Sequence, residues 1–497
     1  MKAAEEEEDD EFSEVEPDAV PPEVRAWLTS TFTRGPSGAR KAGGDDISGK
    51  PKFRSVANAI RAGIFVERIC RRPSASAFLN YPPSVTRQLK RIDDWDFDVF
   101  GLNVASDGSP LKYLGYELFT RYGILNKYKI SSGTLIAFLN GMEAGYAKYN
   151  NPYHNSSHAA DVTQTVHYLL FQCGLMNWLS DLEIFGTLLA AMIHDFEHTG
   201  TTNNFHVMSN SGVALLYNDR AVLENHHISA AFRLCHDGEN SNIFKNMTRE
   251  EYRELRALVI EMVLATDMSF HFQQVKQMRS TISLPDSRVE KAKVLSLALH
   301  SCDISHPSKP WNLHHIWTLR LMEEFFRQGD LENDLGLPYS PLCDRNTTHV
   351  ADAQLSFIDF IVEPTMNLLG DVLTKILTPS NPDGATESAA LSSPSSTSLT
   401  SGASHQVIPE AIEVTSVPET ERKQKESQVK EATSEDTPGK NRKETKGVAS
   451  QRSNVGGYAR KVRQVYYRNL MENEPALCKS FGRAAGFSQM CQLLTSP

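Results

Sequence analysis

Two separate stretches place ionisable side chains on faces where a buried helix is expected. The stretch HDFEHTG, residues 194–200, follows a long apolar run that begins near Leu182. The stretch VLSLALHSCDISHP puts Asp303 four residues after Leu299, on the apolar side of a predicted helix. An ionised carboxylate there must be paired or bound to a metal ion, because burying an isolated charge is costly.

Histidines extend this set to four candidate metal ligands. In YHNSSHAADVTQTVHYLL, His158 lies on an apolar helical stripe and His154 precedes it by about one turn. Either histidine alone is more often a hydrogen-bonded core residue than a ligand. Together, two imidazoles and two carboxylates form a nitrogen-and-oxygen set that suits zinc, magnesium or manganese. The four candidates are His158, His194, Asp195 and Asp303.

This donor set favours a centre with two metal ions. A carboxylate can bridge two cations, whereas an imidazole cannot. A water between two such cations becomes hydroxide near neutral pH and can attack a phosphorus atom. The residues therefore predict metal-dependent hydrolysis at a phosphorus atom.

A zinc protease is the alternative reading of the first stretch. HDFEH has the histidine spacing of the H-E-x-x-H proteases, with aspartate in place of the general-base glutamate. Residues 194–198 are predicted to continue the helix, so that His194 and His198 share one face as i and i+4, with Asp195 on its flank. This alternative needs a third ligand downstream and leaves His158 and Asp303 without a role.

The elements that must position these residues are predicted to be helices. From about residue 110 to 377, apolar residues recur at spacings of three and four, and alternating patterns are scarce. Asp219 is predicted to cap the helix through AVLENHHISAAFRLC, and Gly329 to end the helix through WTLRLMEEFFRQ. We therefore expect a compact all-α domain much larger than a four-helix bundle.

Composition narrows the class of protein. The net charge of −10, with dispersed lysines and arginines, argues against a nucleic-acid binder. The seven cysteines are widely spaced and never form a C-x-x-C pair, which favours a reducing compartment. No apolar run reaches the length of a membrane helix, and the acidic N-terminus does not resemble a signal peptide. We expect a soluble, cytoplasmic protein with no membrane or nucleic-acid partner.

Changes in composition divide the chain into five predicted parts. Residues 1–50 read as a flexible regulatory segment, 51–78 as a basic amphipathic linker helix and 79–378 as the catalytic domain. Residues 379–457 contain too little apolar surface to form a core and are predicted to be a disordered linker. Residues 458–497 form a tail to which the sequence assigns no role.

Many ordered motifs resemble the catalytic domain of class I 3′,5′-cyclic-nucleotide phosphodiesterases. Over roughly residues 110–375 these motifs are YHNSSHAADVTQTVH, IHDFEHTGTTNNFH, YNDRAVLENHH, MVLATDMSFHFQQ, CDISHP, MEEFFRQGD, LPYSPLCDR and QLSFIDFIVEP. Upstream, VPPEVRAWLTSTFTR and KPKFRSVANAIRAGIFVERICRR resemble the calmodulin-dependent subfamily, most closely its C isoform. The resemblance implies an all-α fold of about sixteen helices and hydrolysis of cyclic AMP (cAMP) and cyclic GMP (cGMP) to 5′-monophosphates.

The resemblance also implies a role for each matching residue. His158, His194, Asp195 and Asp303 match the zinc ligands, and the two aspartates also serve a second ion, Mg²⁺ or Mn²⁺. The residues that match holders of this ion's waters are His198, Glu224 and Thr266. His154 matches the general acid that protonates the leaving O3′, and Glu324 matches the carboxylate that orients it. Five residues match the nucleotide-binding positions: Tyr153, His306, Leu321, Gln354 and Phe357.

The basic segments near the N-terminus suggest regulation. Residues 51–72 carry six lysines and arginines against the single acid Glu67, with apolar residues at helical spacing. Basic amphipathic helices suit the acidic, methionine-lined groove of calmodulin, but they can equally pack on a catalytic domain. The subfamily resemblance favours calcium-loaded calmodulin binding at residues 22–42 and a packing role for 51–72. A homodimer, and a calmodulin-binding scaffold with an inactive centre, are also compatible with the sequence.

Overall fold

The computed structural model describes residues 81–238, 240–284 and 289–377. Within these ranges it has sixteen α-helices and no β-strand, which confirms the all-α prediction. The predicted segments 1–50, 51–78, 379–457 and 458–497 lie outside the described residues, as do residues 79, 80 and 378 of the predicted catalytic domain.

The first half of the described chain contains nine of these helices. Their bounds are α3 Pro83–Leu89, α4 Val99–Ala105, α5 Pro110–Arg121, α6 Ile124–Lys127, α7 Ser132–Tyr146, α8 Ser156–Phe171, α9 Asp181–Ile193, α10 Asn203–Met208 and α11 Gly212–Tyr217. The 3₁₀ turn η2, Leu175–Trp178, joins α8 to α9.

The second half contains the remaining seven. Their bounds are α12 Val222–Asp237, α13 Arg249–Leu264, α14 His271–Ser283, α15 Lys291–Asp303, α16 Trp311–Asp334, α17 Val350–Phe357 and α18 Glu363–Leu377. The 3₁₀ turns η3, Met268–Phe270, and η4, His306–Ser308, precede α14 and α16, and the π-helical turn η5, Ile358–Val362, joins α17 to α18.

Helix α8 lies at the centre of the packing. It contacts α5, α9 and α15, while α13 packs against both α9 and α15. Nearly every side chain from Ser157 to Leu170 is buried, including polar ones. These polar groups have partners: the Gln164 amide donates to the carbonyls of Ile92 and Asp94 at 2.8 Å. A helix buried on all sides can therefore carry a histidine into the interior.

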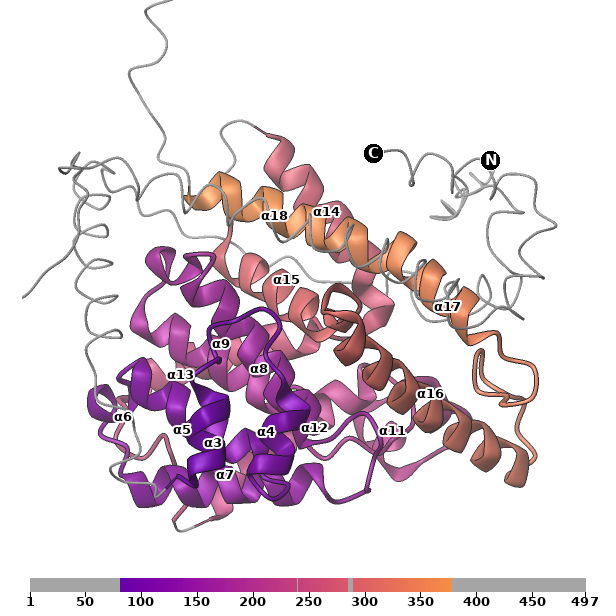
Figure 1. Ribbon diagram of the computed structural model, residues 1–497, viewed down its shortest axis with the longest axis horizontal. Helices are drawn as coiled ribbons and strands as arrows, with labels where there is room; N and C mark the ends of the chain where they lie inside the picture. The colour runs from indigo at the N-terminus through magenta and orange to yellow at the C-terminus, as the bar shows by residue number, and fades with distance from the viewer. Residues whose placement is uncertain (1–80, 239, 285–288, 378–497) are drawn as a thin grey trace, which may run out of the picture. The chain divides into compact units, whose positions relative to one another are not determined.

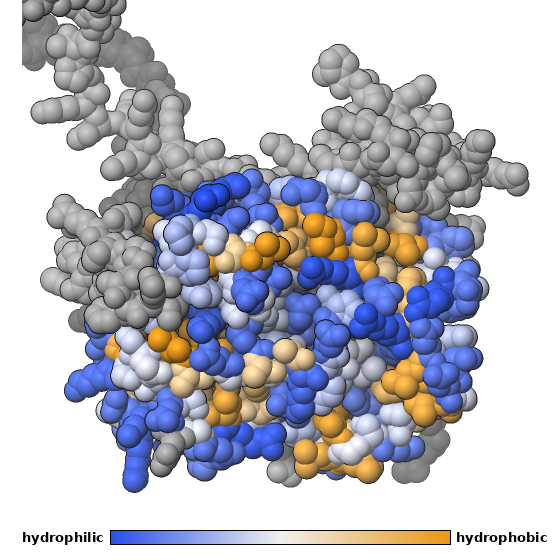
Figure 2. Space-filling model, turned by 60° about the horizontal axis from the view of Figure 1, so that its bottom comes forward, coloured by the Kyte–Doolittle hydropathy of each residue, from blue (hydrophilic) through white to orange (hydrophobic). Residues whose placement is uncertain are grey.

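The other helices surround this centre. Figure 1 shows α14, α15 and α18 together at one side, where they contact one another, with α3, α5 and α7 at the opposite side of α8 and α9. One continuous hydrophobic core links α3–α9, α12, α13 and α15. On the face shown in Figure 2, hydrophobic residues form separate patches among hydrophilic ones. Among the described residues, none of the helices combines the length and hydropathy needed to cross a bilayer.

Two predicted helix ends are wrong. Helix α12 begins at Val222 after Ala221, and Asp219 does not cap it, because both residues adopt left-handed backbone angles before the helix starts. Helix α16 does not end at Gly329 but continues to Asp334. A Cβ at position 329 would lie 2.0 Å from the carbonyl oxygen of Cys343, so this glycine permits close packing of a following segment.

Candidate metal centre

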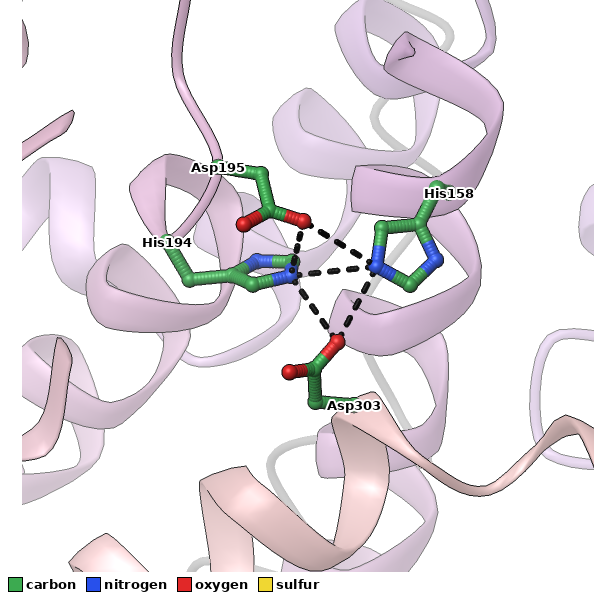
Figure 3. Close-up of side chains that lie close together, drawn as sticks. All are labelled: His158, His194, Asp195 and Asp303. Carbon is green, nitrogen blue, oxygen red and sulfur yellow. Dashed lines mark hydrogen bonds and ion pairs between the residues drawn. The ribbon is translucent and has the colours of Figure 1, made fainter. Parts of the chain in front are cut away.

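The four predicted metal ligands come from three elements and converge on one point. His158 lies in the first turn of α8, which starts after Asn155 because the Asn155 side chain accepts the Ser157 N–H at 2.9 Å. His194 and Asp195 follow directly after α9, and Asp303 is the last residue of α15. Figure 3 shows the four side chains pointing toward one another.

The distances between the donor atoms fit a shared metal ion. His158 Nε2 lies 3.1 Å from Asp303 Oδ1 and 3.2 Å from Asp195 Oδ2. His194 Nε2 lies 3.0 Å from Asp195 Oδ2, 3.4 Å from Asp303 Oδ1 and 3.2 Å from His158 Nε2. Four ligands each about 2.0–2.1 Å from a zinc ion are about 3.3 Å apart. Five of the six separations among the four donor atoms, 3.0–3.4 Å, are therefore those of ligands that share one ion.

The hydrogen bonding also indicates that a positive charge belongs among these atoms. His194 Nδ1 donates to the Ala191 carbonyl at 2.9 Å, which leaves a lone pair on Nε2 directed at two carboxylates and another imidazole. Burial alone would lower the pKa of His194, yet Asp195 and Asp303 hold it well above its usual range. Acceptors brought together in this way fit a bound cation.

A second pair of side chains lies beside this cluster. His154 Nδ1 is hydrogen-bonded to Glu324 Oε1, while Glu324 Oε2 accepts the backbone N–H groups of Tyr153 at 2.9 Å and His154 at 3.0 Å. His154 Nε2 lies 3.9 Å from Asp195 Oδ2. Burial opposes charge on both groups, but their mutual attraction raises the pKa of His154 to about 9 and lowers that of Glu324 to about 2. The pair is an imidazolium held by a carboxylate.

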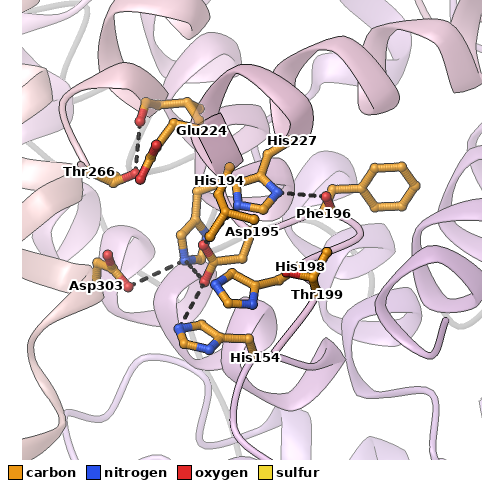
Figure 4. Close-up of polar contacts among 12 residues, drawn as sticks. His154, His194, Asp195, Phe196, His198, Thr199, Glu224, His227, Thr266 and Asp303 are labelled. Atoms are coloured by element: carbon orange, nitrogen blue, oxygen red, sulfur yellow. Dashed lines mark hydrogen bonds and ion pairs between the residues drawn. The ribbon is translucent and has the colours of Figure 1, made fainter. Parts of the chain in front are cut away.

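Three more predicted residues lie around Asp195. The His198 ring stacks on the His154 ring, with centroids 3.8 Å apart. In the view of Figure 4, Glu224 and Thr266 lie on the other side of Asp195 from His154. Burial and the charge of Asp267 raise the pKa of Glu224 to about 8, and Thr266 donates to the Val263 carbonyl at 2.7 Å.

The sequence interpretation missed His227. Its Nδ1 donates to the Phe196 carbonyl at 2.7 Å, so Nε2 carries a lone pair that faces Asp195 Oδ1 at 3.7 Å. Two acceptors at this separation can share a water or a cation. His227 follows Glu224 by three residues on α12, and this spacing was the available signal. The adjacent His226 obscured it, because His226 instead pairs with Glu197 at 3.0 Å.

Of the predicted nucleotide-binding residues, Tyr153 and His306 lie beside the metal cluster. The Tyr153 ring lies 4.7 Å from the His158 ring and 5.9 Å from that of His306. Gln354 is buried, and its Oε1 accepts the Thr318 hydroxyl at 3.3 Å. Leu321 and Phe357 are partly buried side chains that pack against the main hydrophobic core.

The geometry excludes the zinc-protease alternative. Helix α9 ends at Ile193, and Glu197 has a left-handed φ of 60°, so residues 194–198 form a turn. The predicted shared helical face of His194 and His198 is therefore wrong. His194 joins the four-donor cluster, whereas His198 joins His154 and Glu324.

Comparison with known proteins assigns these features to a family. A model described as 3′5′-cyclic nucleotide phosphodiesterase matches residues 153–381, and a model of the N-terminal region of that family matches residues 5–68. The chain is 60% identical over 402 residues to the dual specificity calcium/calmodulin-dependent 3′,5′-cyclic nucleotide phosphodiesterase 1 of Drosophila melanogaster, covering 81% of this chain and 48% of that protein. It is 56% identical over 371 residues to the 1C enzyme of that name from Homo sapiens, covering 75% of this chain and 52% of the other.

The chain therefore spans about half the length of these curated relatives. It covers more of the 1B enzyme of Mus musculus, namely 68% at 55% identity, with 75% of this chain aligned. A crystal structure of the phosphodiesterase domain of the RhoPDE fusion protein from Salpingoeca rosetta has a TM-score of 0.53 and 30% identity, and the match covers 57% of this chain and 90% of that one. On these matches, the chain belongs to the 3′,5′-cyclic nucleotide phosphodiesterase family.

Proposed function

We propose that this chain hydrolyses cAMP and cGMP to their 5′-monophosphates. The observation that carries the proposal is the four-donor cluster of His158, His194, Asp195 and Asp303 with the His154–Glu324 pair beside it. A cyclic phosphodiester needs charge neutralisation at phosphorus and a proton for its leaving oxygen, and this site offers a place for each. The curated relatives named above are dual specificity 3′,5′-cyclic nucleotide phosphodiesterases, which supports this assignment.

We infer zinc at the four-donor cluster and Mg²⁺ or Mn²⁺ beside Asp195. Two imidazoles with two carboxylates suit zinc, whereas a site built from carboxylate and water oxygens suits the harder ion. Bound there, the two cations would supply an activated water and neutralise phosphate charge. Four side chains around Asp195 would orient waters at the second ion: His198, Glu224, His227 and Thr266.

In this proposal His154 is the general acid. Glu324 holds its Nδ1, so the proton on Nε2 faces the metal cluster and can pass to the departing O3′. Two backbone N–H groups fix Glu324, which keeps the imidazole from rotating. A positioned acid contributes roughly 10²–10⁴-fold to such a reaction.

The nucleotide base is assigned to the group around Gln354. A side-chain amide presents a donor and an acceptor, so it can pair with either adenine or guanine. Phe357 and Leu321 would enclose the purine between an aromatic and an aliphatic surface, with Tyr153 and His306 nearby. This arrangement supports hydrolysis of both cAMP and cGMP.

The decisive experiment is metal removal and replacement on the purified full chain. Hydrolysis of cAMP and cGMP should disappear after chelation and return when zinc is restored together with magnesium or manganese. His154→Ala should lower kcat about 10²–10⁴-fold while the metal content stays the same. Hydrolysis that persists at the original rate without bound metal would refute the proposal.

We further propose that calcium-loaded calmodulin binds residues 22–42 and activates the enzyme. The relatives named above are calcium/calmodulin-dependent, and Trp27, Leu28 and Phe32 provide bulky anchors between Arg25 and Arg34. Activity of the full chain should rise on adding calcium and calmodulin. Replacing Trp27 and Leu28 with alanine should remove the increase and leave basal hydrolysis intact. Equal activation of both proteins would place the calmodulin site elsewhere.

A further inference from the structure

Two loops that are distant in sequence meet at the stacked histidines. His154 precedes α8, and His198 belongs to the turn after α9. Their rings are nearly parallel, with an interplanar angle of 14° and centroids 3.8 Å apart. Because neither histidine lies in a helix, other contacts must fix this stack.

The Asn151 side chain supplies such a contact. Its Nδ2 donates to the His154 carbonyl at 3.0 Å and to the His198 carbonyl at 2.6 Å. Both hydrogens of the amide are therefore used, and the side chain is buried. One amide thus sets the separation between the two backbones that carry the stacked rings.

Gly200 completes the arrangement. It has a φ of +78°, and a Cβ there would lie 2.6 Å from Asn151 Oδ1, so no larger residue leaves room for this amide. Its N–H donates to His198 Nδ1 at 3.0 Å. His198 Nδ1 is thus an acceptor, and the neutral ring carries its proton on Nε2. A neutral ring can stack on a protonated His154 without charge repulsion.

We propose that Asn151 is a positioning residue that, together with Gly200, holds the His154–His198 stack and so aims His154 at the leaving oxygen. This inference rests on the proposed role of His154 as general acid. Asn151 would not touch the substrate. Losing its two hydrogen bonds would let the His154 loop shift relative to the metal cluster, and small displacements of a catalytic group are costly in rate.

The test is Asn151→Leu in the full chain, which keeps the approximate shape and removes both donors. We expect kcat for cAMP to fall about 10- to 100-fold, with KM within about threefold and bound metal unchanged. Asn225→Leu is the matched control, because the Asn225 amide also bridges two carbonyls, of Arg220 and Ala221, at 3.0 Å each. The control should retain the kcat of the original chain.

A double-substitution cycle separates positioning from general damage. In a His154→Ala background, Asn151→Leu should lower kcat by less than about twofold, since the group that it positions is gone. A full additional loss in that background, or an unchanged kcat in the single variant, would overturn the inference. Gly200→Ala gives an independent route if Asn151→Leu does not fold, and it should show the same non-additivity. If His154→Ala itself had no effect, the proposed acid would be wrong, a result distinct from failure of the Asn151 inference.

Discussion

The Asp303 carboxylate is the ligand whose loss the cluster should tolerate least. It closes the site from α15, opposite the ligands of α8 and the turn after α9. Asp303→Asn keeps the shape but replaces a carboxylate with a weak metal ligand, so activity toward both nucleotides should fall by at least about 10³-fold with metal lost.

Metal analysis, kinetics and circular dichroism on the same sample test this prediction. Helical content should remain, because Asp303 is the last residue of its helix. Asp330→Asn is the control, since Asp330 pairs with Arg345 at the surface. A variant at position 303 that kept its metal and turnover would remove Asp303 from the ligand set.

Glu324 should affect turnover more than binding. Glu324→Gln removes the negative charge that faces His154. It also replaces one of two accepting oxygens with an amide NH₂ group, although the partners of both oxygens are N–H groups. We expect kcat to fall about 10- to 100-fold with little change in KM, since outer partners of catalytic groups typically contribute this much. Steady-state kinetics test this, and Glu323→Gln, which alters an exposed neighbour paired with Arg327, should be neutral. Equal losses in both variants would contradict a special role for Glu324.

At the scale of elements, the metal-bearing turn depends on how closely it packs against α7. Phe196 lies directly against Gly145, where a Cβ would be 2.0 Å from the ring. Gly145→Ala must therefore displace Phe196 and with it Asp195, and it should lower the free energy of unfolding by about 1–3 kcal/mol.

Gly370→Ala in α18 is the matched comparison. Nothing lies within 4 Å of a Cβ there, so alanine should be neutral or stabilise by up to about 1 kcal/mol through helix propensity. Denaturant titration of both variants measures the two effects. If Gly145→Ala were as stable as Gly370→Ala, the close approach of α7 to the turn would not limit this position.

These elements also show what local sequence can and cannot predict. The helix of α9 was predictable, because its apolar spacing and the Ser180–Glu183 capping box are local signals. Its end at Ile193 was not, because the left-handed φ of Glu197 has no signature in that residue type. Gly329 was misread for a similar reason: its neighbour Cys343 is distant in sequence, and only the fold brings the two together.

For the whole molecule, the site was more predictable than the contacts that hold it. Charged or titratable residues on apolar stripes, such as His158 and Asp303, are conspicuous because a buried charge requires a partner. Asn151 and His227 gave no such signal, since an asparagine near a proline and one of two adjacent histidines are ordinary in loops and on helix surfaces. Their roles depend on the distances between loops, which the packing of many helices determines together.

That packing also buries several histidines away from the metal cluster, and they should make stability depend on pH. His300 and His314 have no exposed surface, and burial lowers the pKa of His300 to about 4 and, together with the charge of His315, that of His314 to about 3. In the unfolded chain both histidines titrate near pH 6.5. Below this pH the unfolded state takes up protons that the folded state does not, so folding stability falls as pH falls from about 6.5 toward 4.

The slope should be about 1.4 kcal/mol per pH unit for each such histidine. Between pH 6.5 and 5, carboxylates with ordinary or lowered pKa values remain ionised. Glu143 and Glu224, whose pKa values burial raises to about 7 and about 8, oppose the histidine effect there, so the contribution of His314 is taken from the difference between its variant and the original chain. Denaturant titrations of the chelated protein across this window measure the slope. His314→Gln retains hydrogen-bonding groups but does not titrate, so it should reduce the slope by about 1.4 kcal/mol per pH unit. His236→Gln, at a side chain 87% exposed to water, should leave the slope unchanged. A slope that did not respond to His314→Gln would mean that this histidine takes up its proton without unfolding, through an opening of the α16 packing that the static structure does not contain.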